Sequence, residues 1–167
     1  KVERRVQPHR PAKIDQTFLA RALHAALSGR DPSFFRFPLG WPAEETPFNH
    51  PLSYIGADGG AGIGSGPGMA VGAALALRGS GRLPVAVLGD GDFAMGATAI
   101  WTAARYRIPL LVIVSNNQSY FNDEIHQETV ATIRDRPVAN RWIGQRLDDP
   151  AVDVQGLAAS LGAQSAP

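Results

Sequence analysis

Two short, continuously apolar segments most constrain what this chain can fold into. They are residues 85–88 (VAVL) and residues 110–114 (LLVIV), and a helical pattern lies between them. In that pattern apolar residues recur at i, i+3, i+4 and i+7, at Ala97, Ile100, Trp101 and Ala104. Continuously apolar strands joined by a helix are typical of a parallel sheet flanked by helices on both faces. We therefore predict an α/β fold and expect the helical stripe to face its core.

The sequence predicts further elements on either side of this unit. An apolar stripe predicts a helix over residues 14–27 that ends at Gly29, and residues 69–77 predict a buried helix rich in alanine and leucine. Residues 33–41 and 52–56 predict two short strands, the first ended by Pro38. After residue 152 we expect one more helix and the beginning of a strand.

Domain organisation follows from the same pattern. Residues 1–13 are charged and interrupted by prolines, which predicts an interdomain linker. Residues 14–167 then form one domain. Because the last predicted strand only begins, we expect this domain to be truncated at its C-terminus.

Composition excludes several classes of function. The 167 residues are 44% hydrophobic and 19% charged, with a formal net charge of +1. This is a globular balance that provides no basic field for nucleic acid. Cysteine is absent, which excludes disulfides and thiolate metal sites and fits a cytoplasmic protein. No apolar run approaches the ~20 residues that span a bilayer, so we expect neither a nucleic-acid nor a membrane partner.

A glycine turn with acidic residues follows the first apolar strand. Residues 89–94 (GDGDFA) match the dinucleotide pattern G-x-G-x-x-G/A, and backbone N–H groups at such a turn bind phosphate. A nicotinamide-dependent oxidoreductase is therefore one interpretation. That site needs an acid about 20 residues further on, where this chain has Ser115-Asn116-Asn117 instead. Asp90 and Asp92 would also repel a bare diphosphate.

A divalent cation beside the turn removes this repulsion. Mg²⁺ prefers about six oxygen ligands, which include carboxylate and phosphate oxygens. Asp90 ends one strand and Asn117 ends its neighbour, so they offer a carboxylate and an amide oxygen. The carbonyl of Ser119 and two diphosphate oxygens would nearly complete the shell. Because open α/β sheets bind ligands at the carboxyl ends of their strands, the sequence predicts a metal–diphosphate site there.

Gly89-Asp90-Gly91, followed by 24 residues and then Asn116-Asn117, resembles the signature of thiamine diphosphate-dependent enzymes. The stretch looks most like the acetolactate synthase, benzoylformate decarboxylase and pyruvate decarboxylase branch. The upstream segment GGAGIGSGPGMAVGAALAL is similar to that branch's second glycine segment. The resemblance covers roughly residues 50–125 and implies the C-terminal, diphosphate-binding domain of the family.

The resemblance implies a thiamine diphosphate- and Mg²⁺-dependent lyase or carboligase. Its substrates would be 2-oxo acids, and its reaction decarboxylation, acyloin formation or both. Acetolactate synthase-like and benzoylformate decarboxylase-like activities stay open. So do two other interpretations, the nicotinamide-dependent oxidoreductase using residues 89–94 and a non-catalytic homologue.

The resemblance also assigns roles to individual residues. Asp90, the side chain of Asn117 and the carbonyl of Ser119 would bind the metal, while Gly91 and Asp92 would offer N–H groups to the diphosphate. The Asp92 side chain could also cap the helix. Ile63 would bend the cofactor, and the carbonyl of Ala61 or Gly62 would accept a hydrogen bond from its amino group. The other expected cofactor contacts are Gly89, Phe93, Tyr120 and Phe121.

The family's activating glutamate belongs to a separate domain, usually on a partner subunit. The glutamates of this chain, which include Glu124 and Glu128, lie in predicted loops or at a helix start and have no such context. We therefore expect a homo-oligomer, a dimer or a tetramer, with the cofactor at a subunit interface and no turnover by this chain alone. The roles of His50, His126 and the mixed-charge segment 134–150 stay open.

Overall fold

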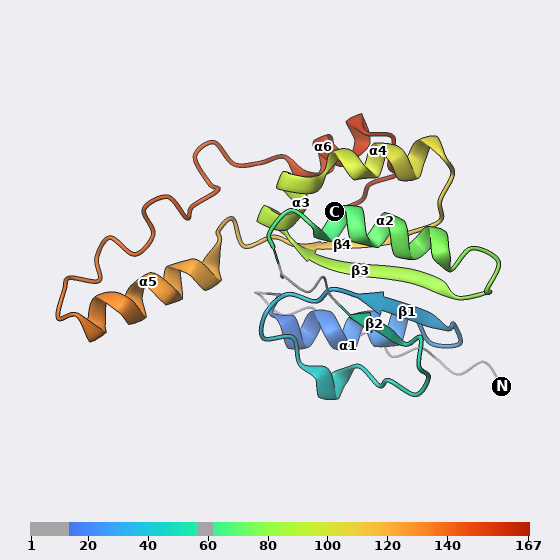
Figure 1. Ribbon diagram of the computed structural model, residues 1–167, viewed down its shortest axis with the longest axis horizontal. Helices are drawn as coiled ribbons and strands as arrows, with labels where there is room; N and C mark the ends of the chain where they lie inside the picture. Colours follow the sequence, from blue (N-terminus) through green and yellow to red (C-terminus); the bar gives the residue numbers. More distant parts are fainter. Residues whose placement is uncertain (1–13, 57–61) are drawn as a thin grey trace.

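Four parallel strands form one sheet in the order β2-β1-β3-β4 (Figure 1). The computed structural model describes residues 14–56 and 62–167, so the linker expected at residues 1–13 lies outside the described residues. The strands are β1 (Pro32–Phe35), β2 (Tyr54–Gly56), β3 (Leu83–Gly89) and β4 (Leu111–Ser115). The predicted parallel sheet is confirmed, and the two continuously apolar segments are the neighbours β3 and β4.

Helices cover both faces of this sheet. They are α1 (Gln16–Ala26), α2 (Gly66–Ala76), α3 (Asp90–Gly96), α4 (Thr98–Arg105), α5 (Phe121–Ile133) and α6 (Val154–Ser160), with a short 3₁₀ helix η1 (Ala43–Glu45). In Figure 1, α1 lies on one side of the sheet, and α2, α4 and α6 lie on the other. The predicted helices over residues 14–27 and 69–77 correspond to α1 and α2, and α6 follows residue 152 as expected.

Strand β3 lies at the centre of the core, and its side chains point alternately into two apolar layers. Val85 and Val87 pack with Leu23 and Leu27 at the end of α1. Ala86 and Leu88 face the other way and pack with residues of α2, α3 and α4. Each valine or leucine side chain that is fully buried in this way stabilises the fold by about 1.5–3 kcal/mol. The alternation explains why residues 85–88 are apolar without interruption.

Three expectations about the helices on this second face are wrong in detail. The predicted helix after the glycine turn is two helices, because α3 begins at Asp90 and α4 follows from Thr98. Its buried stripe is also shifted, since Ile100 is 6% exposed but Trp101 is 55% exposed. The buried positions of this region are Ala97, Ile100 and Ala103, which follow an i, i+3 row. Helix α2 is buried on one face only.

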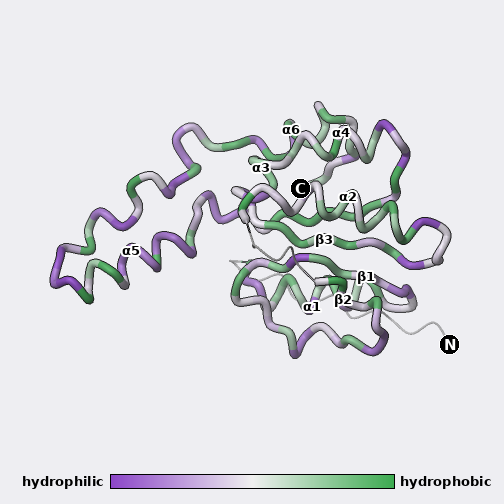
Figure 2. Tube along the Cα trace, in the orientation of Figure 1, coloured by the Kyte–Doolittle hydropathy of each residue, from purple (hydrophilic) through white to green (hydrophobic). Residues whose placement is uncertain are grey.

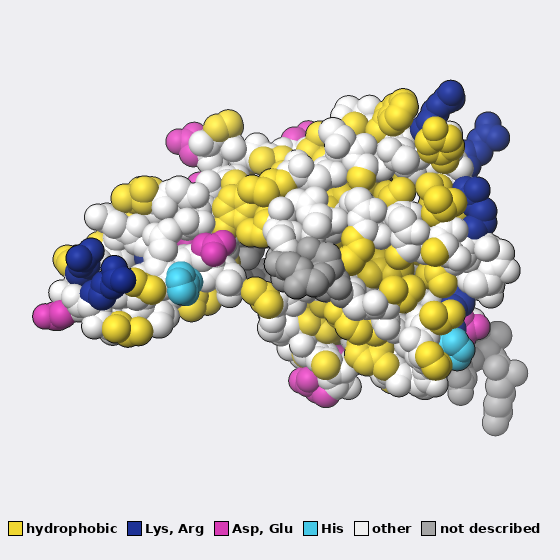
Figure 3. Space-filling view, in the orientation of Figure 1, with side chains coloured by type: hydrophobic (Ala, Val, Ile, Leu, Met, Phe, Trp, Pro, Cys, Tyr) yellow, Lys and Arg dark blue, Asp and Glu magenta, His cyan; other side chains and the backbone are white. Residues whose placement is uncertain are grey.

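Residues 121–150, which we call the arm, extend away from the sheet and return to it (Figure 1). The arm consists of α5 and the irregular segment that follows. Hydrophilic and hydrophobic residues alternate along it (Figure 2), and Figure 3 shows its apolar side chains interspersed with charged ones. Ile133, Trp142 and Ile143 are exposed there.

The chain closes against the second face of the sheet. Leu161 and Ala163, which follow α6, pack against the core, and residues 161–167 form no strand. Among the described helices, none combines the length and the apolar character needed to cross a membrane.

Candidate functional site

The candidate site lies where β3 and β4 end. These strands pair in parallel with Gly89 opposite Ser115, so the segments that follow them emerge at the same edge of the sheet. Asp90 is the first residue of α3, which makes the Gly-Asp-Gly sequence the first helical turn rather than a separate loop. The amides of this turn have no partner within the helix.

Asp90 is buried, and no cationic side chain of the described residues pairs with it. Its exposure is 5%, and none of the ion pairs among the described residues includes it. Burial raises the pKa of the Asp90 carboxyl, and the backbone N–H groups of Gly91, Gln118 and Ser119 oppose that shift. A buried carboxylate is costly unless it is paired or binds a metal. Within residues 14–56 and 62–167, Asp90 therefore has no positive partner of the kind that a bound cation would supply.

The turn after β4 directs the N–H groups of Gln118 and Ser119 toward this carboxylate and contains two asparagine side chains. Asn116 Oδ1 accepts a hydrogen bond from the Gln118 N–H at 3.1 Å, and Asn117 Oδ1 accepts one from the Ser119 N–H at 3.0 Å. Gln118 adopts a positive φ of 57°, which tightens the turn. The amide oxygen of Asn117 keeps a second lone pair for a ligand.

This donor set fits magnesium. A carboxylate, an amide oxygen and a backbone carbonyl are hard oxygen ligands of the kind that Mg²⁺ takes, together with phosphate oxygens. The described part of the chain has no cluster of three or more His, Cys, Asp or Glu side chains that could hold a metal. A cation here would therefore combine the single carboxylate of Asp90 with amide, carbonyl and phosphate oxygens.

Tyr120 packs directly on the glycine turn. A Cβ atom added at Gly91 would lie 2.2 Å from Cε1 of Tyr120, so only glycine fits at this position. Burial and the negative charge of Asp90 both raise the pKa of the Tyr120 hydroxyl. The structure thus brings Gly91, Asp90 and Tyr120 together at the first turn of α3.

The other predicted contacts are placed differently. The Phe93 side chain is 2% exposed within the core, which leaves only its backbone for the diphosphate. Ile63 and Phe121 are 46% and 51% exposed, so neither is a core residue. Gly62 is described, whereas Ala61 lies outside the described residues.

Asp92 turns its side chain toward the glycine segment, which we define as residues 62–66. Its Oδ1 accepts hydrogen bonds from the N–H groups of Gly64 at 2.7 Å and Gly66 at 3.2 Å. Its Oδ2 lies 2.6 Å from Nε of Arg36. The helix that Asp92 caps is therefore α2, which starts at Gly66, rather than its own helix.

Glu124 is a buried charge that sequence reasoning missed. It is 1% exposed, accepts a hydrogen bond from the Ser119 hydroxyl and pairs with Nε of Arg146 at 2.9 Å. The Tyr120 N–H donates to the Gln145 carbonyl at 2.9 Å beside this pair. Together these contacts fix the returning end of the arm to the turn after β4. The sequence signal was limited to an acid in the first turn of a predicted helix.

Among the described residues, no hydrogen bond or ion pair joins His50 or His126 to the site. His50 is exposed, and its Nδ1 accepts a hydrogen bond from the Leu52 N–H at 3.0 Å. His126 is exposed on α5.

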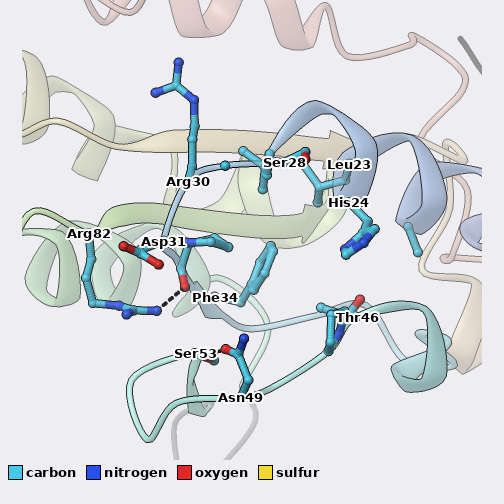
Figure 4. A pocket seen from close by; sticks show the side chains of 15 residues that line it. Leu23, His24, Ser28, Arg30, Asp31, Phe34, Thr46, Asn49, Ser53 and Arg82 are labelled. Atoms are coloured by element: carbon cyan, nitrogen blue, oxygen red, sulfur yellow. Dashed lines mark hydrogen bonds between the residues drawn. The ribbon is translucent and has the colours of Figure 1, made fainter. Parts of the chain in front are cut away.

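A cavity of about 230 Å³ lies at the opposite end of the sheet (Figure 4). Its lining includes His24, Asn49 and Arg82, close to where β1 and β3 begin. Arg82 donates hydrogen bonds to the Ser33 hydroxyl and the Pro32 carbonyl, both at 2.6 Å. Arg82 therefore ties the beginnings of β1 and β3 together. None of the predicted site residues lines this cavity.

The chain is similar in sequence to two enzymes of known name. It is 35% identical over 99 residues to a benzoylformate decarboxylase of Pseudomonas aeruginosa, which covers 58% of this chain and 15% of that protein. It is 34% identical over 103 residues to a 2-hydroxyacyl-CoA lyase of Oryza sativa subsp. japonica, which covers 62% of this chain and 16% of that protein.

A solved structure is similar over most of the chain. The thiamine diphosphate-dependent 4-hydroxybenzoylformate decarboxylase of Rhodococcus jostii RHA1 superposes with a TM-score of 0.70 at 27% identity. The match covers 92% of this chain and 27% of that one. The chain thus spans a minor part of the length of each of these relatives.

The family match agrees with the site geometry. The sequence profile described as "Thiamine pyrophosphate enzyme, C-terminal TPP binding domain" matches residues 39–166, which include the glycine segment, the first turn of α3 and the turn after β4. The chain therefore belongs to the family of C-terminal thiamine pyrophosphate-binding domains of thiamine pyrophosphate enzymes.

Proposed function

We propose that the protein containing this chain is a Mg²⁺- and thiamine diphosphate-dependent lyase or carboligase that acts on 2-oxo acids. The observation that carries the proposal is the placement of Asp90. Its buried carboxylate has no cationic partner among the described residues and lies beside the turn that contains Asn117 and Ser119. Both features stand at the carboxyl ends of adjacent parallel strands, where open α/β sheets bind ligands.

Separate parts of the chain bind the two ends of the cofactor. Asp90, the Asn117 amide oxygen and the Ser119 carbonyl hold the metal, and the N–H groups of Gly91 and Asp92 bind the diphosphate. The glycine segment receives the rest of the cofactor against Ile63. When bound, thiamine diphosphate supplies the electron sink that cleavage of a carbon–carbon bond beside a carbonyl requires.

The names of the relatives support the reaction class. Two of them are decarboxylases of benzoylformate and 4-hydroxybenzoylformate, which favours decarboxylation of a 2-oxo acid by this protein too. The third is a 2-hydroxyacyl-CoA lyase, which supports the broader lyase class. Carboligation, as in acetolactate synthase, belongs to the same proposal because it uses the same electron sink.

We further propose a homo-oligomer, a dimer or a tetramer, with the cofactor at a subunit interface. Exposed apolar side chains on the arm, such as Ile133 and Trp142, support an interface there. Glu124 is engaged with Ser119 and Arg146. An activating carboxylate for the cofactor would then come from a different domain.

Turnover of 2-oxo acids by the intact protein tests the proposal. Carbon dioxide release from benzoylformate and from pyruvate is measured with thiamine diphosphate and Mg²⁺, and again after chelation of the metal. We expect release that requires both, that Asp90→Ala abolishes and that Asp153→Ala leaves intact. Asp153 is a matched control because it is an acidic cap at the beginning of α6.

Two results would favour the alternatives. Binding of NADH that survives metal chelation would support the nicotinamide-dependent oxidoreductase. Metal-dependent binding of thiamine diphosphate without turnover of any 2-oxo acid would support the non-catalytic homologue.

A further inference from the structure

We propose that Arg36 and Asp92 form a clamp that fixes the glycine segment against the first turn of α3. In this role they are positioning residues for the thiamine half of the cofactor. The inference rests on the proposed function, and it assigns these two side chains a task distinct from metal and diphosphate binding.

The clamp reaches the glycine segment at several points. Asp92 Oδ1 accepts from the N–H groups of Gly64 and Gly66, at 2.7 and 3.2 Å. Arg36 donates to the Ser65 hydroxyl and to the Gly62 carbonyl, both at 3.1 Å. Nε of Arg36 lies 2.6 Å from Oδ2 of Asp92, and Oδ2 receives no aligned hydrogen bond within the described residues, so this contact is an ion pair.

Burial distinguishes this pair from an ordinary surface salt bridge. The side chains of Arg36 and Asp92 are 12% and 8% exposed. Exposed ion pairs contribute little because water screens them, whereas removal of one partner from a buried pair leaves an uncompensated charge. Loss of either side chain should therefore release the contacts that the other one makes.

Arg36 is itself held firmly at the end of β1. It has a positive φ of 52°, which is uncommon for a residue with a side chain. Its N–H donates to the Gly56 carbonyl at 3.1 Å, and its carbonyl accepts from the Val87 N–H at 3.4 Å. The guanidinium thus extends from a backbone that is fixed between β2 and β3.

The clamped segments are in direct contact. A Cβ atom at Gly66 would lie 2.1 Å from Asp92 Oδ2, and one at Gly96 would lie 2.3 Å from the Gly64 carbonyl oxygen. No space remains for the glycine segment to approach α3 more closely. This close contact and the polar contacts of Asp92 and Arg36 together fix its position.

Ile63 lies between two of the fixed points. The peptide group before it contains the Gly62 carbonyl, which accepts from Arg36 at 3.1 Å and also from the Ser65 hydroxyl at 2.7 Å. The peptide group after it contains the Gly64 N–H, which donates to Asp92. Fixing both peptide planes fixes the φ and ψ of Ile63 and hence the direction of its Cα–Cβ bond. That side chain is 46% exposed, so core packing does not set its direction.

Comparison of two ligands in the intact protein tests the clamp. The dissociation constants of thiamine diphosphate and of inorganic pyrophosphate are measured with Mg²⁺ for wild type, Asp92→Asn and Arg36→Gln. A buried charge-assisted bond corresponds to a factor of about 10–100 in an equilibrium constant. We expect both variants to weaken thiamine diphosphate binding by about tenfold or more and pyrophosphate binding by less than about threefold.

Glu45→Gln is the matched control, since it breaks the exposed pair of Glu45 with Arg21. It should change neither dissociation constant. Equal weakening of both ligands by Asp92→Asn and Arg36→Gln, or no weakening, would overturn the clamp.

Hydrogen exchange in the cofactor-free protein provides a second readout. Both variants should accelerate exchange at the amides of Gly64 and Gly66, and unchanged exchange would contradict the clamp. If wild type shows no metal-dependent binding of thiamine diphosphate, the proposed function fails, while the exchange rates still decide whether Arg36 and Asp92 fix the glycine segment.

Discussion

The pair formed by Glu124 and Arg146 should respond very differently to removal of its two partners. Glu124 is 1% exposed, whereas the Arg146 side chain is 45% exposed. Removal of Arg146 therefore leaves the Glu124 carboxylate buried without its cationic partner. Removal of the Glu124 charge leaves the Arg146 guanidinium, which can be hydrated. The expected order of destabilisation is Arg146→Ala well above Glu124→Gln.

The magnitudes follow from the contacts. Removing one partner of a buried pair costs about 3–5 kcal/mol, and the half exposure of Arg146 reduces this to about 2–4 kcal/mol. In Glu124→Gln the amide keeps the side-chain volume and its oxygen can still accept from the Ser119 hydroxyl. That change should cost about 1 kcal/mol, the typical net value of one hydrogen bond.

Urea unfolding at neutral pH measures both free energies. The control is Arg141→Ala, because Arg141 pairs with Glu128 on the same arm with both side chains about 40% exposed. It should cost less than about 1 kcal/mol. Protease cleavage within the arm should also accelerate most in Arg146→Ala. A loss in Glu124→Gln equal to or greater than that in Arg146→Ala would refute the reasoning.

Three further substitutions test individual features of the site. Burial raises the pKa of the Asp90 carboxyl in the folded state. The neutral carboxyl therefore stabilises the fold below the ordinary carboxyl pKa. That contribution to the free energy of unfolding is lost as the pH rises through the higher folded-state pKa. Asp90→Asn should therefore raise the unfolding free energy of the cofactor-free protein at pH 7 by about 1–2 kcal/mol, and an unchanged stability–pH profile would contradict this. Gly91→Ala should cost about 1–3 kcal/mol through overpacking against Tyr120, and thermal unfolding should show partial recovery when Tyr120→Ala is added. Ile63→Ala should change stability by less than about 0.5 kcal/mol, because Ile63 is exposed, yet calorimetry should show weaker thiamine diphosphate binding; equal binding would remove Ile63 from the site.

The sheet and the two segments of the site, which are the first turn of α3 and the turn after β4, could be predicted because each has a local sequence pattern. A continuous apolar run such as residues 85–88 reports burial on both faces of a strand. Once β3 and β4 are parallel neighbours, Asp90 and Asn117 must emerge at one edge. Neither step requires knowledge of distant side chains.

The side-chain contacts that hold these segments in place could not be predicted in the same way. Asp92 bonds to the glycine segment and to Arg36, which are far from it in sequence. Glu124 meets Arg146 only because the arm returns to the turn after β4. Trp101 was expected in the core because an apolar period does not show which of two adjacent rows faces the neighbouring helix. Each of these features depends on tertiary packing.

The most direct test of the central claim is calorimetric titration of the intact protein with thiamine diphosphate, with and without Mg²⁺. We predict saturable binding that requires Mg²⁺ in wild type and is lost in Asp90→Ala, because Asp90 supplies the charged ligand of the metal. Binding of equal strength without Mg²⁺, or metal-dependent binding that survives Asp90→Ala, would contradict the assignment of this site.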